Sequence, residues 1–268
     1  MNASRSPENW QQLSCPICEG VAFTRLFEKG GEPFVRCNGC TLIMINPRPL
    51  YSDIIHTYTH GYSTHYIDKH EKKLRRAGKM VRRLSGIVPR GRWLDIGCSA
   101  GFTLQAARAA GFDPYGVEVD PLGVKYATEV FGLKNIFLGS LEEQNFPDGF
   151  FDVITVVEVI EHVPNLNRFC AEMKRVLSPT GIIYLTTPDV AHWRTPKPLH
   201  RWEAILPSQH LYYFSKDTLQ RLLEKHGLKI VKKRFNLKPG IKVNVTHADH
   251  GHQHPGAFKS GDNRFVRE

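Results

Sequence analysis

The sequence predicts an α/β fold, in which a parallel β-sheet is covered by helices on both faces. The first observation is that short apolar strand segments alternate with helical segments from about residue 92 onward. The second is a glycine turn at residues 93–101, Trp-Leu-Asp-Ile-Gly-Cys-Ser-Ala-Gly, which joins a short apolar run to the Ala- and Leu-rich segment 102–110. A strand, a tight glycine turn and a helix form the layout of a nucleotide-binding α/β unit.

Length and composition limit the possible classes of protein. With 268 residues, the chain has room for one sizeable α/β domain and a small appendage. A hydrophobic content of 41% and a charged content of 23% are typical of a globular protein, and no apolar run approaches the length of a membrane span. The N-terminus lacks an apolar signal core, so we predict a cytoplasmic protein. The formal charge of +10 permits an anionic partner such as nucleic acid, although an unspecialised basic surface explains it equally well.

Two cysteine pairs near the N-terminus predict a metal-binding ribbon over residues 1–46. Cys15 and Cys18 form one C-x-x-C pair, and Cys37 and Cys40 form the second after eighteen intervening residues. This spacing is typical of a zinc ribbon, in which the metal replaces a core that so small a segment cannot build. Two disulfides or a redox pair are the alternative, which a cytoplasmic location disfavours. Four thiolates leave no open ligand position, so the zinc is predicted to be structural.

Residues 47–90 are predicted to form a linker and lid helices. Pro47 and Pro49 mark a rigid joint. Four tyrosines follow, and they either form an aromatic lid or simply pack the joint: Tyr51, Tyr58, Tyr62 and Tyr66.

Apolar side chains recur at three-to-four spacing over 67–88, which predicts an amphipathic helix with a basic opposite face. That face could follow phosphates, but no aromatic side chains interleave for base stacking, so nucleic acid is not favoured.

Residues 91–246 are predicted to form the main domain, followed by a disordered, His-rich tail over 247–268. The predicted strands are 92–96, 114–118, 135–138, 151–157, 181–186, 228–235 and 241–246, and the predicted helices are 101–110, 121–131, 165–177 and 216–226. A long irregular insert over 188–209 follows the fifth strand. Its position beyond the carboxyl end of a strand makes it a candidate substrate wall.

The glycine turn resembles motif I of the class I S-adenosylmethionine (SAM) methyltransferases, D-x-G-x-x-x-G, through Asp95, Gly97 and Gly101. A second strand ending at Glu118 matches the carboxylate that reaches the ribose diol in this family. Ser140 stands where the family usually has Asp. The resemblance implies SAM as cofactor and a Rossmann-like, seven-stranded sheet whose last strand is antiparallel. The cofactor-binding residues it implies are Asp95, Gly97, Cys98, Gly101, Phe102, Glu118, Val119, Ser140, Leu141 and Glu158.

The ribbon followed by Asn46-Pro47-Arg48-Pro49 resembles the front end of bacterial methyltransferases that act in sugar or polysaccharide pathways. This resemblance implies methyl transfer to an oxygen or carbon of a small-molecule or carbohydrate-type acceptor. Two alternatives remain: an RNA methyltransferase that uses the ribbon and the basic helix, and a non-catalytic SAM-binding or zinc-ribbon scaffold.

Two histidines are candidates for the catalytic base, His162 after the fourth strand and His210 after the fifth, because imidazole titrates near neutral pH. Together with Glu158 and Glu161 they also resemble the E-x-x-E-H…H set that binds a divalent ion in small-RNA 2′-O-methyltransferases. The alternative is that this loop only shapes the cofactor pocket.

Overall fold

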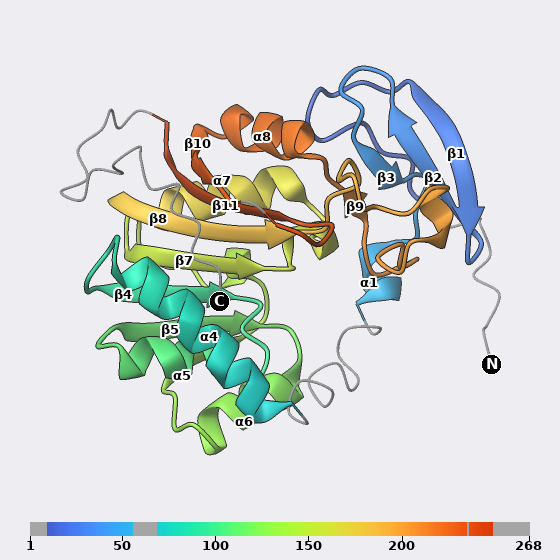
Figure 1. Ribbon diagram of the computed structural model, residues 1–268. Coiled ribbons are helices and arrows are strands. Elements are labelled where there is room, and N and C mark those ends of the chain that lie inside the picture. Colours follow the sequence, from blue (N-terminus) through green and yellow to red (C-terminus); the bar gives the residue numbers. More distant parts are fainter. Residues whose placement is uncertain (1–9, 56–68, 235, 249–268) are drawn as a thin grey trace.

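The protein contains two β-sheets that lie side by side (Figure 1). The structure, a computed structural model, describes residues 10–55, 69–234 and 236–248. The larger sheet has seven strands in the order β10-β11-β8-β7-β4-β5-β6, and the smaller has four in the order β1-β2-β3-β9. The predicted α/β class is therefore confirmed.

The seven-stranded sheet is mixed. Its strands are β4 (Arg92–Ile96), β5 (Asp113–Glu118), β6 (Asn135–Leu138), β7 (Phe151–Val157), β8 (Leu177–Thr187), β10 (Leu228–Lys233) and β11 (Ile241–His247). The pairs β4–β5, β4–β7, β5–β6 and β7–β8 are parallel, whereas β11 runs antiparallel to both β8 and β10. This order matches the Rossmann-like sheet that the resemblance implied, including its antiparallel last strand.

Helices cover both faces of this sheet. They are α4 (His70–Ser85), α5 (Phe102–Ala109), α6 (Pro121–Glu129), α7 (Leu166–Val176) and α8 (Lys216–Lys225). Alternate residues of each strand point to opposite faces. Trp93 and Val153 therefore pack with α4 and α5 on one face, while Leu94 and Ile154 pack with α7 and α8 on the other.

Local signals mark the helix ends that the sequence predicted. Asp120 caps α6 by accepting a hydrogen bond from the Leu122 amide, and Ser215 caps α8 by accepting one from the Thr218 amide. Short 3-10 turns lie at η2 (Leu141–Glu143), η3 (Ile160–His162) and η4 (Leu199–Arg201). None of the helices described combines the length and apolar character needed to cross a membrane.

The smaller sheet joins the N-terminal ribbon to a late part of the chain. Its strands are β1 (Phe23–Lys29), β2 (Glu32–Cys37), β3 (Ile43–Ile45) and β9 (Tyr212–Tyr213), and the short helix α1 (Tyr51–Ile54) follows the ribbon. Strand β9 pairs antiparallel with β3 through Tyr212 and Tyr213. Trp202 and Ile205 from the predicted insert pack with Phe34 of β2 in one apolar cluster. The ribbon therefore shares its core with the insert, which fits the expectation that it cannot build one alone.

The four ribbon cysteines form one cluster. Their sulfur atoms all lie within 4.8 Å of one another, with 3.3 Å between the sulfurs of Cys15 and Cys40 and 3.4 Å between those of Cys18 and Cys37. All four thiols are free, and a disulfide would require about 2.05 Å. Sulfurs bound to one tetrahedral zinc at about 2.3 Å lie about 3.8 Å apart. A Cβ on Gly39 would lie 3.1 Å from the sulfur of Cys18, so the second turn comes close to the cluster. The arrangement fits a zinc ribbon.

Two sequence predictions lie mostly outside the described residues. They are the candidate lid, of which Tyr58, Tyr62 and Tyr66 are not described, and the tail apart from His247 and Ala248.

The purified protein is expected to contain about one zinc ion per chain, because the four thiolates complete a tetrahedral site. Cys18→Ser should lower the zinc content and the midpoint of thermal unfolding, since metal binding contributes directly to the stability of small metal-dependent domains. Elemental analysis and calorimetry measure the two quantities. Cys170→Ala, which removes a buried thiol outside the cluster, is the control for zinc content. A zinc-free wild-type protein with an equally stable ribbon would contradict this assignment.

Candidate functional site

The site is built around the glycine turn between β4 and α5. Gly97 has φ +69°, and a Cβ there would lie 2.6 Å from a methyl group of Val159, in the loop that follows β7. Gly101 has φ +79°, and a Cβ there would lie 2.8 Å from the Cβ of Ala127 on α6. The turn therefore needs glycine at both positions, first for contact with the loop after β7 and then for packing under α6.

Asp95 lies at the start of this turn and is held by a buried chain of hydrogen bonds. The Trp93 indole donates to the Thr155 hydroxyl over 3.0 Å, and that hydroxyl donates to Oδ1 of Asp95 over 2.6 Å. Burial raises the pKa of Asp95 to about 7, although the hydrogen bond from Thr155 acts in the opposite direction. This carboxyl therefore changes charge near neutral pH.

Glu118, at the end of β5, is held by backbone amides. Its Oε2 accepts from the Ser99 amide over 2.6 Å, and its Oε1 accepts from the amides of Val119 and Asp120 over 2.8 and 2.9 Å. Burial raises the pKa of Glu118, and these three donors oppose the shift. A carboxylate has about four lone-pair sites, two on each oxygen, so Oε2 retains capacity for a ligand.

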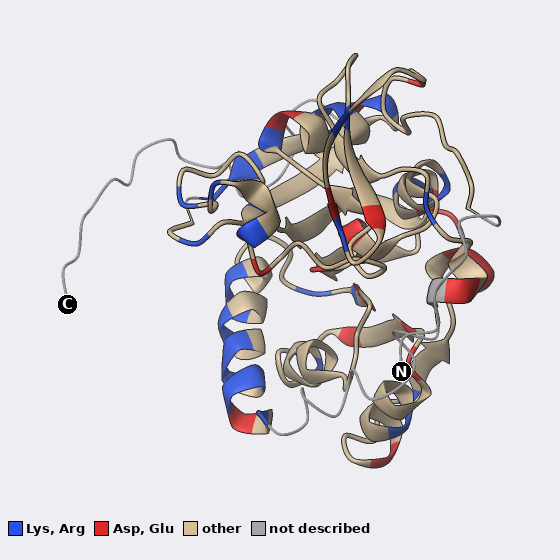
Figure 2. Ribbon diagram, turned by 90° about the vertical axis from the view of Figure 1, so that its right-hand side faces the viewer, with Lys and Arg blue, Asp and Glu red and all other residues tan. Residues whose placement is uncertain are grey.

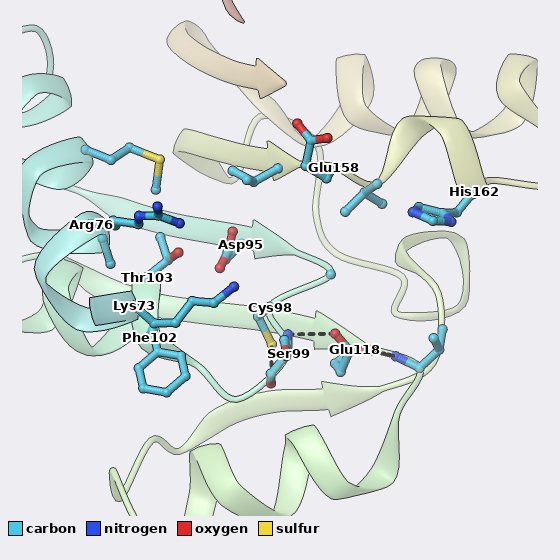
Figure 3. A pocket seen from close by; sticks show the side chains of 16 residues that line it. Lys73, Arg76, Asp95, Cys98, Ser99, Phe102, Thr103, Glu118, Glu158 and His162 are labelled. Atoms are coloured by element: carbon cyan, nitrogen blue, oxygen red, sulfur yellow. Dashed lines mark hydrogen bonds between the residues drawn. The ribbon is translucent and has the colours of Figure 1, made fainter. Parts of the chain in front are cut away.

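Two adjacent cavities open beside this turn. One has a volume of about 400 Å³ and contains Asp95, Ser99 and the α4 face in its wall (Figure 3). The other has a volume of about 500 Å³ and extends past Leu141 to Tyr51 of α1. Five residues line both cavities: Gly97, Glu118, Val119, Val159 and His162.

The predicted cofactor residues gather at these cavities with one exception. The first cavity is lined by Asp95, Gly97, Cys98, Phe102, Glu118, Val119 and Glu158, and the second by Gly97, Glu118, Val119, Ser140 and Leu141. Gly101 lines neither cavity and instead packs against α6. Ser140 and Glu143 form a capping box that holds η2 at the second cavity.

Sequence reasoning missed two cations in the first cavity. Lys73 and Arg76, one turn apart on α4, extend toward Asp95 and the glycine turn (Figure 3). Burial lowers the pKa of Lys73 to about 8, and repulsion from Arg76 adds to this shift. The sequence does show that this helix is rich in Lys and Arg. Only the packing of α4 on α5 decides that these two side chains point toward the cavity.

The other cations of α4 are exposed, and the ribbon of this helix is mostly blue in Figure 2. They are Lys72, Arg75, Lys79, Arg82 and Arg83, of which Arg83 lies over the ring of Tyr184. A nucleic-acid partner for this face stays an alternative that the sequence does not favour.

The glycine-turn loop also carries an unpaired hydroxyl. Oγ of Ser99 is buried and has no hydrogen-bond partner in the described part of the chain. Ser99 lies in the left-handed region, at φ +47°, and it lines the first cavity. A buried hydroxyl without a partner is costly, so this atom is suited to a polar ligand.

A second polar cluster lies at the carboxyl ends of β7 and β8. Glu161, His162 and His210 each offer one ligand atom within 4.8 Å of the others. Nδ1 of His162 lies 2.9 Å from the Gln209 carbonyl, and Nδ1 of His210 lies 2.9 Å from the Ala204 carbonyl. A carbonyl only accepts hydrogen bonds, so each Nδ1 carries the proton and each Nε2 has a lone pair.

Burial keeps both rings neutral over the ordinary pH range. It lowers the pKa of His162 to about 4, and burial together with the charge of His162 lowers the pKa of His210 to about 3. The two ring centroids lie 4.6 Å apart. A general base is most effective when its pKa is near the operating pH, whereas a neutral imidazole is the usual form of a metal-ligating histidine.

Glu161 has one satisfied and one unsatisfied oxygen. Its Oε2 accepts from the Thr187 hydroxyl over 2.9 Å, while Oε1 is buried without a partner among the described residues. Glu158 lies outside the three-residue cluster, with φ +56° and its Oε1 accepting from the Thr186 hydroxyl. The structure thus brings together three of the four residues of the predicted divalent-ion set.

Comparison with known proteins gives the family. A family model described as a methyltransferase domain matches residues 67–233. A ubiquinone biosynthesis O-methyltransferase from Rickettsia canadensis is 26% identical over 171 residues, which cover 56% of this chain and 72% of that protein. A 2-methyl-6-phytyl-1,4-hydroquinone methyltransferase from Synechocystis is 33% identical over 130 residues, which cover 46% of this chain and 39% of the relative.

Solved structures agree with this result at the level of the fold. A SAM-dependent methyltransferase from Corynebacterium glutamicum aligns with a TM-score of 0.52 at 19% identity, covering 70% of this chain and 98% of the other. The matched domain includes the glycine turn, Glu118, the whole lining of the first cavity and all of the second except Tyr51 and Ile55. From this family match and the sheet order, the chain belongs to the methyltransferase-domain family and is a class I SAM-dependent methyltransferase.

Proposed function

We propose that this enzyme methylates a hydroxyl oxygen of a small molecule that carries an oxygenated ring. The observation that carries the proposal is the pair of joined cavities, which meet at Glu118 and His162. The names of the two relatives support it, because both refer to quinone or hydroquinone compounds and one specifies O-methylation. Neither name refers to a sugar, so a carbohydrate-type acceptor and a carbon acceptor atom take second place.

Residues of both cavities would hold SAM. Glu118 accepts a hydrogen bond from a ribose hydroxyl, since backbone donors fix both of its oxygens and Oε2 retains a lone pair. Val119 and Leu141 enclose the adenine, with Ser140 as a hydrogen-bonding partner at its edge.

The methionine part of SAM would lie in the first cavity. Its carboxylate pairs with Lys73 and Arg76, which line the wall formed by α4. Its ammonium faces Asp95. The unpaired Ser99 hydroxyl is available to hydrogen-bond the methionine part as well.

The transfer is a direct displacement, for which SAM supplies an activated methyl group. The protein's main contribution is alignment of the acceptor oxygen with that methyl. His162 lies where the two cavities join and therefore faces the reacting atoms. We assign His162 and His210 to the acceptor side of the site.

A divalent cation at Glu161, His162 and His210 is part of the proposal. Two neutral imidazoles with fixed tautomers and one carboxylate with an unsatisfied buried oxygen make a suitable donor set. A bound ion of this kind lowers the pKa of an acceptor hydroxyl and orients it.

The first test concerns the cofactor. Glu118→Gln is expected to weaken SAM binding by about 10- to 100-fold, because a hydrogen bond to a charged group contributes about 1.5–3 kcal/mol. Calorimetric titration with SAM and S-adenosylhomocysteine measures the change. Glu129→Gln, at an exposed position at the end of α6, is the matched control. Zinc-loaded, folded wild-type protein that binds neither compound would refute the proposal.

Labelled SAM then allows hydroxylated aromatic rings and free sugars to be screened as acceptors.

The second test uses the titration of Asp95. A carboxyl with a pKa of about 7 is mostly protonated at pH 5, whereas the SAM ammonium favours its ionised form. Binding at low pH must therefore remove a proton, so affinity should rise by up to about tenfold per pH unit toward pH 7 and then level off. Calorimetry from pH 5 to 7, below the pKa of Lys73, measures this dependence. Asp95→Asn should show a flat profile over the same range, and a flat wild-type profile would rule out the assigned contact.

The third test concerns the cation. Wild-type protein is expected to bind one Mn²⁺ beyond its zinc, detected by electron paramagnetic resonance of the titrated ion. His210→Ala and Glu161→Gln should each weaken that binding by at least about tenfold, as the loss of a ligand requires. His200→Ala, which changes an exposed histidine, is the control. Equal Mn²⁺ affinity in wild type and His210→Ala would exclude the site.

A further inference from the structure

The turn that carries His210 is bound to the ribbon at several points. Strand β9 follows directly after His210 and Leu211 and pairs with β3, and the Ile45 amide donates to the Leu211 carbonyl over 3.2 Å. Nζ of Lys29 donates to the Ile205 carbonyl over 2.8 Å. The Leu211 amide donates to the Glu161 carbonyl over 2.8 Å, so the same segment also touches the polar cluster.

Glu32 of β2 makes the most specific of these contacts. It is a buried carboxylate, only 2% exposed. Its Oε2 accepts from the Ser208 amide over 2.6 Å, and its Oε1 accepts from the Ser208 hydroxyl. Ser208 is in the left-handed region, with φ +60°, a conformation that is unfavourable for a residue other than glycine. Two charge-assisted hydrogen bonds stabilise that conformation.

The residue after Ser208 completes the connection. The Gln209 carbonyl accepts the Nδ1 proton of His162, and this bond fixes the tautomer of that ring. His210 follows, and its ring packs against that of His162. A shift of the turn at Ser208 would therefore move both the acceptor for His162 and the ring of His210.

We propose that Glu32 is a positioning residue of the methyltransferase site, through which the ribbon holds the 207–210 turn and thereby sets the placement of both histidine rings and the tautomer of His162. The inference rests on the proposed function, since the two histidines must act on the acceptor side for their placement to matter. It gives the ribbon a role in the site beyond its own stability.

The test compares three variants of the full-length, zinc-loaded protein. In Glu32→Ala both bonds to Ser208 are lost. In Glu32→Gln the amide oxygen can still accept from the Ser208 amide while the NH₂ group donates to the hydroxyl oxygen, so function should be partly rescued. Glu28→Ala, which removes an exposed carboxylate of β1 paired with Arg25, is the control.

The primary readout is ¹⁵N NMR of the histidine side chains, with the signals identified by His162→Gln and His210→Gln. Wild type and Glu28→Ala should show His162 as the single Nδ1-protonated tautomer. Glu32→Ala should show a mixture of tautomers, with SAM affinity within twofold of wild type. Unchanged tautomers in a folded Glu32→Ala protein would overturn the proposal. This readout needs no acceptor, so it separates the inference on Glu32 from failure of the proposed methyl transfer.

Turnover is the second readout once screening has given an acceptor. Glu32→Ala should lower kcat by about 10- to 100-fold, the usual effect of losing a supporting contact behind a functional side chain, and Glu32→Gln by less. If Glu32→Ala does not fold, Ser208→Gly replaces it, because glycine adopts φ +60° freely and removes only the hydroxyl bond. If Ser208→Gly and Glu32→Gln both showed the kcat and the histidine tautomers of the wild-type protein, the proposal would be overturned.

Discussion

The carboxylate of Glu118 is the point on which the candidate cofactor site depends. Its three backbone hydrogen bonds tie the loop after β4 to the end of β5, so the glycine turn cannot move independently of the second strand. Because parallel strands end at the same edge of a sheet, this contact also fixes where the two cavities meet. Val159, in the loop after β7, then closes against Gly97 with no room for a side chain between them. This part of the cavity walls is thus set by contacts of the Glu118 and Val159 side chains with the backbone of the glycine turn.

Buried charge is arranged differently at the two ends of the site. At the cofactor end, carboxyls and cations face each other across the first cavity, where Asp95 and Lys73 both titrate closer to neutral pH than usual because of burial. At the other end, burial favours neutral imidazoles beside the buried carboxyl of Glu161. Perturbed groups of this kind cluster at functional sites because the same dry environment that shifts a pKa also strengthens interactions with a ligand.

Much of the fold followed from local patterns. The strands 135–138 and 151–157 were predicted with the bounds that the structure shows, and the caps at Asp120 and Ser215 mark the helices they precede. Most of the candidate cofactor residues were found in the same way, since they sit in a motif with fixed spacing next to a strand end. Lys73 and Arg76 were not found, because a basic helix has the same sequence whether its cations face solvent or a cavity. Gly101 lines neither cavity, and its close packing against Ala127 leaves no room for a side chain.

The sequence by itself determined the α/β class, the glycine turn with its carboxylates and the cysteine spacing of the ribbon, because each depends on residues close together in the chain. Tertiary structure alone decided that β9 would complete the ribbon sheet and that Glu32 would bind Ser208, a residue 176 positions away. It also selected Glu161, His162 and His210 as one cluster and left Glu158 outside it. Contacts of this kind arise when apolar surfaces such as Phe34 and Trp202 are buried together, and that burial depends on the shape of the whole molecule rather than on any local pattern.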